Sequence, residues 1–244
     1  MRTRLKLKPI ISMACVSAVV ALLVILIDAA VRSDPNALSL IEANPWLFAH
    51  LVHIPQFLIP FLIILYLTKG RPQEYGFNLR QDSHITHKRV LATGLLFGLL
   101  FSFKYMPQIF RTGGVEVAQP VNAANIVGRM TFQWIVVGLS EETMFRGLIQ
   151  TYLMKNLEGE VRILGHDFHI GTVIGAVLWG LFHFLNVLIM PIGPVVFLVV
   201  LTTAIGLILG YAYQRTGSLL TTIIMHNTIF GVPLTIGYLL NWLL

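Results

Sequence analysis

Three ionisable side chains lie inside long apolar stretches of this sequence, where burying an ionisable group is unfavourable. They are Glu141, His183 and His226. Placing an ionisable group within a bilayer costs roughly 2.5–3.5 kcal/mol, so such groups usually serve a function. A helical rise of about 1.5 Å per residue puts Glu141 and His183 roughly 21 Å, and His226 roughly 17 Å, from the inner ends of their helices. The matched depths predict that the three side chains converge on one polar cavity.

Two charged neighbours of Glu141, Glu142 and Arg146, are four residues apart, so they share a helix face and can pair. Glu141 lies about 100° around the same helix and has no obvious local partner. A buried carboxylate without an adjacent cation suits general acid and base chemistry. In the structural alternative, the histidines only donate interhelical hydrogen bonds and the Glu–Arg pair only stabilises its helix. Three such features at one depth, beside a second glutamate, favour a function.

Six further histidines form pairs that are three residues apart, a spacing that could bind a metal ion on a helix. The pairs are His50/His53, His84/His87 and His166/His169. The last two pairs lie in expected cytoplasmic loops, and the first lies toward the outer end of its apolar run. We therefore expect solvated or interfacial roles for all of them.

The composition indicates that membrane-spanning helices hold these groups. Of 244 residues, 56% are hydrophobic and 11% are charged, against about 25% charged in soluble domains. This excludes a soluble globular domain, a disordered chain and, because Cys15 is the single cysteine, a disulfide scaffold. Apolar runs of about 20 residues predict the spans, and these runs are Pro9–Ile27, Ala43–Thr68, Val90–Phe110, Asn122–Ser140 continuing to about Lys155, Phe168–Gln214 and Thr216–Leu244.

The predicted fold is an all-α, polytopic transmembrane bundle of about eight helices, in which the first span is not cleaved. The run Phe168–Gln214 is broken at Pro191-Ile-Gly-Pro194 and supplies two spans. The last run is broken at Gly231-Val-Pro233, so we expect two short final helices. Seven helices result if that last run is instead one kinked helix.

The basic residues set the orientation, because lysine and arginine mark the cytoplasmic side of membrane proteins. With the N-terminus inside, the outer loops contain only Arg32 and Arg111, whereas 12 basic residues lie inside, namely Arg2, Arg4, Lys6, Lys8, Lys69, Arg71, Arg80, Lys88, Arg89, Lys155, Arg162 and Arg215. An even number of helices then predicts both termini on the cytoplasmic side. The net charge of +6 is explained by this asymmetry, and no nucleic-acid partner is expected.

Residues from about 120 to 230 resemble the CPBP family of intramembrane proteases, also called Abi or type II CAAX endopeptidases. The resemblance rests on Glu141-Glu142-x-x-x-Arg146-Gly147, on a later histidine after an aromatic residue, and on Arg215-Thr-Gly-Ser218 leading to His226. It implies that Glu141 activates water, that Glu142 and Arg146 brace the site, that His183 holds the water with Glu141, and that His226 helps to stabilise the oxyanion.

The sequence departs from the family pattern at two positions. Trp179 replaces the phenylalanine of the FxxxH motif, which is a mild aromatic exchange. Phe230 replaces the asparagine of the HxxxN motif, and a phenyl ring cannot donate to an oxyanion. Asn186, one turn after His183, could substitute for that amide. Asn227 is adjacent to His226 but points about 100° away on a regular helix.

The resulting hypothesis is an intramembrane endopeptidase that hydrolyses a peptide bond with a glutamate-activated water. Residues 1–115, including the cytoplasmic loop 69–89, are expected to form N-terminal helices, and residues 116–244 the catalytic core. No cofactor is required; the alternative is Zn²⁺ held by Glu141, His183 and His226, although the sequence has no HExxH motif.

The expected partners are the lipid bilayer and a peptide or protein substrate, which could be membrane-anchored or prenylated. The expected location is a multi-pass position in a bacterial or archaeal cell membrane. Two other functions remain open. One is a non-catalytic membrane scaffold or immunity factor, favoured by Phe230; the other is a small proton-coupled transporter, in which Glu141, His183 and His226 form a relay.

Overall fold

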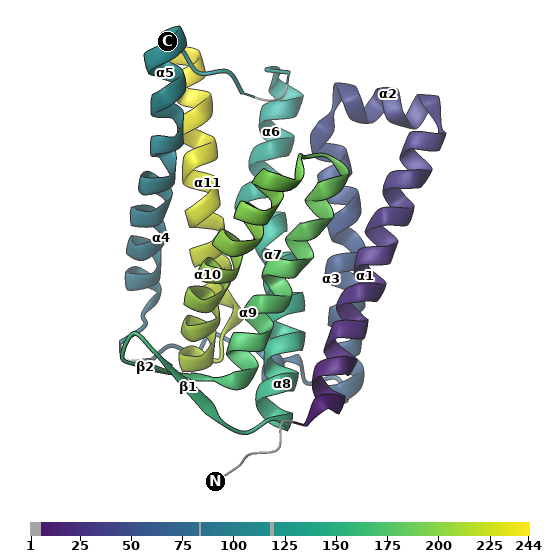
Figure 1. The fold of residues 1–244 in the computed structure, drawn as a ribbon, viewed down its shortest axis with the longest axis vertical. Helices are drawn as coiled ribbons and strands as arrows, with labels where there is room; N and C mark the ends of the chain where they lie inside the picture. Colours follow the sequence, from purple (N-terminus) through teal and green to yellow (C-terminus); the bar gives the residue numbers. More distant parts are fainter. Residues whose placement is uncertain (1–5, 83, 118–119) are drawn as a thin grey trace.

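The chain forms a bundle of long helices in the computed structural model, which describes residues 6–82, 84–117 and 120–244 (Figure 1). Among these residues, six helical segments are long and apolar enough to cross a membrane, which confirms the predicted all-α multi-pass membrane bundle. They are α1 (Leu7–Ser33), α3 (Pro45–Thr68), α4 with η2 and α5 (His87–Thr112), α9 with η5 (Ile170–Leu188), α10 (Ile192–Thr216) and α11 (Leu219–Leu243).

A seventh rod runs through the middle of the bundle and carries the charged motif. It comprises α6 (Ala123–Thr131), the π-helical η3 (Phe132–Val136), α7 (Val137–Glu142), the π-helical η4 (Thr143–Gln150) and α8 (Thr151–Asn156). Every residue from 141 to 150 is buried, so other helices cover this part of the rod on all sides. π-helical turns inside longer helices are rare and occur frequently at functional sites.

The last apolar run forms one helix, α11, and not the two short helices that the sequence predicted. At the expected break, a side chain on Gly231 would lie 2.6 Å from the Trp134 ring, and the carbonyl of Pro233 accepts a hydrogen bond from Tyr105 at 3.0 Å. Neighbouring helices therefore support α11 at its proline, as they do in many membrane helices. A short helix, α2 (Pro35–Ala43), connects α1 to α3 across one end of the bundle (Figure 1).

Because α11 is one helix and not two, the number of spans is odd and the C-terminus lies on the other side of the membrane from the predicted one. Seven rods cross the described part of the bundle, and the start of α1 and the end of α11 lie at opposite ends of it (Figure 1). The prediction that both termini are cytoplasmic is therefore wrong, because it relied on the even number of spans obtained by dividing α11. The loop assignments are the same with seven spans, since α11 follows the last of the basic loops.

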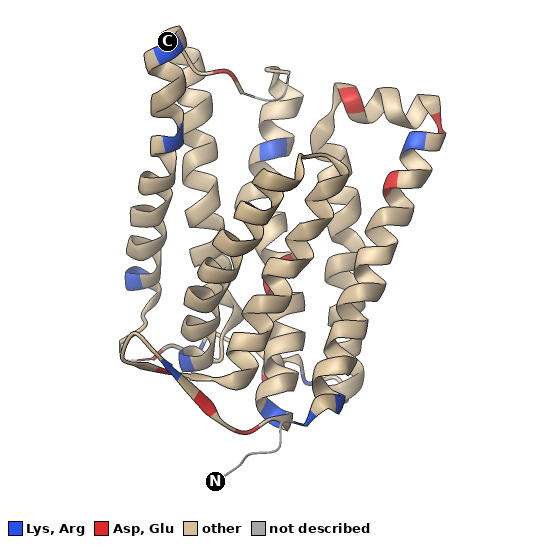
Figure 2. Ribbon diagram, viewed as in Figure 1, with Lys and Arg blue, Asp and Glu red and all other residues tan. Residues whose placement is uncertain are grey.

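Basic residues gather at the end of the bundle where the chain begins, beside the loops that were predicted to be cytoplasmic (Figure 2). Arg2 and Arg4, which contributed to the sequence count, lie outside the described residues. The same end carries η1 (Pro72–Tyr75) and a hairpin of two antiparallel strands, β1 (Glu160–Ile163) and β2 (His166–His169). At the hairpin turn, Leu164 and Gly165 both have positive φ, as a two-residue turn of this kind requires.

Candidate active site

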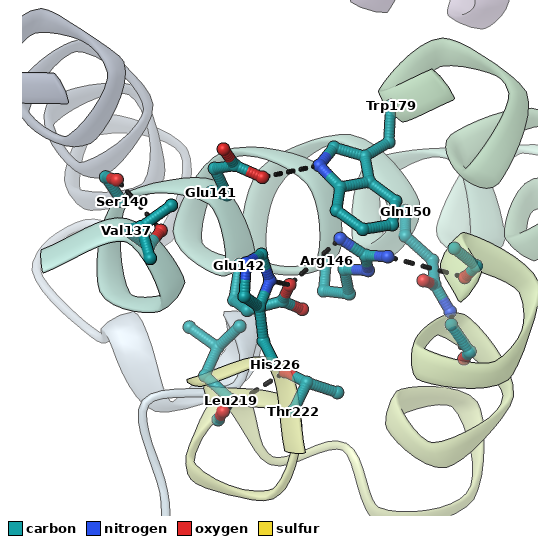
Figure 3. Close-up of polar contacts among 12 residues, drawn as sticks. Val137, Ser140, Glu141, Glu142, Arg146, Gln150, Trp179, Leu219, Thr222 and His226 are labelled. Carbon is teal, nitrogen blue, oxygen red and sulfur yellow. Dashed lines mark hydrogen bonds and ion pairs between the residues drawn. The ribbon is translucent and has the colours of Figure 1, made fainter. Parts of the chain in front are cut away.

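Glu141, on α7, receives its closest polar contact from another helix. The indole nitrogen of Trp179, on α9, donates a hydrogen bond of 2.6 Å to Oε2 of Glu141 (Figure 3). Gly206 on α10 makes room for the indole, because a Cβ there would lie only 2.8 Å from Trp179 Cε3. Trp179 therefore makes a hydrogen bond that the phenylalanine of the family motif could not make, since a phenyl ring has no N–H to donate.

Glu142 is the centre of a separate, fully buried polar cluster. Its Oε1 accepts hydrogen bonds from Arg146 Nη1 at 3.0 Å and from His226 Nδ1 at 2.8 Å (Figure 3). The guanidinium of Arg146 also lies 4.3 Å from the centre of the Trp179 ring and donates to the carbonyl of Gly206 at 3.4 Å. The pairing of Glu142 with Arg146 agrees with their spacing in the sequence. His226, however, is bound directly to Glu142 and not to Glu141.

His183 begins η5 (His183–Leu188), a 3₁₀ turn that continues α9. Its Nδ1 lies 2.9 Å from the carbonyl of Trp179, and this oxygen can only accept, so Nδ1 carries the proton in a neutral ring. Nε2 then has a free lone pair. The backbone carbonyl of His183 accepts a hydrogen bond of 2.8 Å from the side-chain amide of Asn186. These bonds fix the ring edge-on to Trp179, with 5.3 Å between ring centres.

One cavity of about 460 Å³ is lined by all three side chains that the sequence singled out, Glu141, His183 and His226. Trp179 lies among them, since it donates to Glu141 and its ring centre is 5.7 Å from that of His226. Most of the remaining lining residues are apolar. The cavity therefore brings the Glu141 carboxylate and the imidazoles of His183 and His226 together with a wall that can contact an apolar chain.

His53, on α3, also lines this cavity, although the sequence argument placed it toward the outer interface. Its Nε2 is buried and lies 3.5 Å from Glu141 Oε1, a distance suited to an ion pair but long for a hydrogen bond. Its Nδ1 lies 2.7 Å from the carbonyl of Ala49. The prediction of an interfacial role is wrong for His53. A usable signal was the polar repeat His50, His53, Gln56 within an otherwise apolar run.

The candidate amide donors occupy different places. Asn186 lines the cavity, whereas Asn227 turns away from it and donates to the carbonyl of Trp134 at 2.8 Å. Phe230 lines the cavity at the position of the family asparagine, with its ring centre 5.1 Å from that of His226. Of the two asparagines weighed from the sequence, Asn186 is therefore the one that can reach a bound substrate.

A metal site needs three or more suitable ligands around one point. Among the described residues, no three histidine, cysteine, aspartate or glutamate side chains are grouped closely enough to hold one ion. The alternative ligand set Glu141, His183 and His226 lines the cavity without forming such a group, and His226 directs Nδ1 to Glu142.

A comparison with protein-family models supports the resemblance seen in the sequence. Residues 123–230 match the family described as type II CAAX prenyl endopeptidase, Rce1-like. This segment runs from α6 into α11 and includes Glu141, His183 and His226, while His53 lies outside it. Comparisons with curated proteins and with solved structures found no match. Residues 123–230 are therefore similar to the Rce1-like type II CAAX prenyl endopeptidase family, in agreement with the CPBP resemblance.

Proposed function

We propose that this protein is an intramembrane endopeptidase in which Glu141 activates a water molecule. The observation that carries the proposal is the position of the Glu141 carboxylate in a cavity that His183 and His226 also line. Trp179 holds Oε2, so Oε1 is the oxygen available to accept a proton from water. In this proposal residues 116–244 form the catalytic core, and α3 supplies His53 from the N-terminal helices.

The proposed reaction gives a separate role to each of three side chains, Glu141, His183 and His226. Glu141 takes a proton from the water as its oxygen attacks the scissile carbonyl, and later returns that proton to the leaving amine. His183, whose Nε2 carries a lone pair, holds the attacking water. His226, whose Nδ1 is held by the Glu142 carboxylate, donates to the oxyanion from its other ring nitrogen. No metal ion is needed for these steps.

The proposed substrate is a polypeptide that reaches the bilayer interior, either because it is membrane-anchored or because it carries a lipid. The family description names prenyl endopeptidases, and the predominantly apolar wall of the cavity supports a substrate with apolar groups near the scissile bond. The test is cleavage by the purified protein reconstituted in liposomes, with prenylated and unprenylated peptides and with or without 1,10-phenanthroline. Cleavage by wild type that persists with the chelator supports the metal-free reaction, and chelator-sensitive cleavage contradicts it.

A non-catalytic scaffold of the same fold is the second candidate, because Phe230 occupies the place of the family's amide donor. The Phe230→Asn variant tests this directly. If Phe230 weakens the oxyanion site, the variant should raise kcat for a cleaved peptide by up to about 10²–10³-fold, the contribution of one such donor. An unchanged kcat would show that another group, with Asn186 the first to examine, already fills the role. If neither protein cleaves any peptide and Glu141→Gln leaves the cellular phenotype intact, the scaffold function is favoured.

His53 offers a further test with a matched control in the same helix. His53→Asn removes the imidazole beside Glu141 Oε1, whereas His50→Asn removes one that makes the same type of bond, from Nδ1 to the carbonyl of Trp46 at 2.8 Å, without contacting Glu141. A loss of about 1.4 kcal/mol of interaction with the Glu141 carboxylate predicts a roughly tenfold lower kcat/KM for His53→Asn. His50→Asn should keep the wild-type kcat/KM. Equal values of kcat/KM for the two variants would remove His53 from the proposed site.

A further inference from the structure

The cavity extends from the middle of the bundle, where α11 lines it with His226 and Phe230, toward one end. Helix α1 lines it with residues near its C-terminal end, α3 and α10 line it with residues from their first halves, and the central rod lines it from Arg129 up to Glu141 but not beyond. Since successive helices run in opposite directions, these portions all lie toward the end of the bundle opposite the N-terminus (Figure 1). The residues are Val24 and Asp28 of α1, Phe48, Val52, His53 and Gln56 of α3, and Leu198 and Thr202 of α10.

A buried layer closes the cavity on the side of the N-terminus. Glu142 and Arg146 are 0% and 2% exposed, and both side chains are held in the cluster with His226. One turn further along the rod, the amide of Gln150 donates to Thr172 Oγ1 at 3.0 Å and to the carbonyl of Gly210 at 2.8 Å. Apolar side chains on the rod, including Phe145, fill the space around this layer. Hydrogen bonds and packing therefore separate Glu141 from the basic end of the bundle.

A second cavity, of about 500 Å³, lies beyond this layer and is lined by loop and helix-end residues such as Glu74 and Arg80. Within the described part of the chain, none of the residues lining it also lines the first cavity. Water that enters at the basic end thus has a separate compartment that does not include Glu141, His183 or His226.

The charges then decide which side of the membrane the first cavity faces. The basic residues gather at the end of the bundle where the chain begins (Figure 2), and this is the cytoplasmic end by the usual asymmetry of membrane proteins. The first cavity extends away from that end. Its outer part carries one residue of each charge, Arg129 and Asp28, which favours access from water at the outer interface.

We infer that the cavity admits its substrate from the extracytoplasmic half of the membrane. This inference rests on the proposed function for the identity of the occupant, a polypeptide whose scissile bond reaches the bilayer centre from the outer face. The direction of the opening is a property of the fold and does not depend on catalysis. A soluble cytoplasmic tail would have to pass the layer of Glu142, Arg146 and Gln150 to reach Glu141.

The direction of the opening can be measured by cysteine labelling, without any assay of cleavage. A Cys15→Ser background removes the single natural thiol. Gln133→Cys and Leu185→Cys then place a thiol on two walls of the cavity, on the central rod and on η5. Leu164→Cys is the control, because that side chain is 95% exposed at the tip of the hairpin on the basic end. A membrane-impermeant maleimide is added to right-side-out and to inverted vesicles.

Both cavity cysteines should react at least tenfold faster in right-side-out vesicles, and the hairpin cysteine at least tenfold faster in inverted vesicles. The inference is overturned if the cavity cysteines react from the same side as the hairpin cysteine, if the hairpin cysteine reacts in right-side-out vesicles, or if the cavity cysteines react from neither side. Two cavity positions are used so that one poorly folded variant, recognised by gel filtration, does not decide the outcome. Absence of peptide cleavage would defeat the proposed function but would leave the labelling result unaffected.

Discussion

Glu141→Gln is expected to lower the rate of peptide cleavage by about 10²–10⁴-fold or more, while the folded protein remains in the membrane. Glutamine has nearly the same shape as glutamate, and its carbonyl oxygen can still accept the hydrogen bond that Trp179 donates to Oε2. The substitution removes only the capacity to take a proton from water. The measurement is kcat for a peptide cleaved by the wild-type protein in liposomes, together with the yield of monodisperse protein.

The matched control is Glu158→Gln, which makes the same chemical change at an exposed position near the basic end of the bundle. It should retain wild-type kcat. Wild-type activity in Glu141→Gln would contradict the role of Glu141 as the base. A loss of monodisperse protein in Glu141→Gln would instead mean that the carboxylate is needed for folding, and the comparison of rates would then be made on the folded fraction.

Glu142→Gln is expected to destabilise the protein as a whole, because it removes the anion that holds both Arg146 and His226. Breaking a buried ion pair by removing one partner costs about 3–5 kcal/mol, since the remaining charge stays buried without compensation. Arg146 is 2% exposed and cannot turn to water. The measurement is the midpoint of thermal unfolding, followed by fluorescence-detected gel filtration of the detergent-solubilised protein.

The double variant Glu142→Gln with Arg146→Met provides the internal control. Replacing both members of a buried pair by uncharged groups is often neutral, so the second substitution should recover a large part of the midpoint lost in Glu142→Gln. Activity need not recover, because His226 would still lack its carboxylate. A Glu142→Gln protein with an unchanged midpoint would show that the pair does not stabilise the bundle.

Several features of this protein depend on local sequence and were predictable from it. The membrane spans follow from the partitioning of apolar side chains, a property of each segment alone. The contact between Glu142 and Arg146 follows from helix geometry, because residues four apart lie on one face. The depths of Glu141, His183 and His226 follow from the helical rise, and these residues do line one cavity.

Other features were decided by contacts between helices. Whether Pro233 divides the last run into two helices depends on Tyr105 and Trp134, which belong to other helices. The side of the membrane on which the C-terminus lies depends in turn on whether that run forms one span or two. The choice of Glu142 over Glu141 as the partner of His226 depends on how α11 is rotated against the central rod. His53 reaches Glu141 only because α3 packs against that rod. Sequence periodicity identifies the polar face of a helix, but the rotation and depth at which two helices meet are set by the packing of all their side chains, and no single segment contains that information.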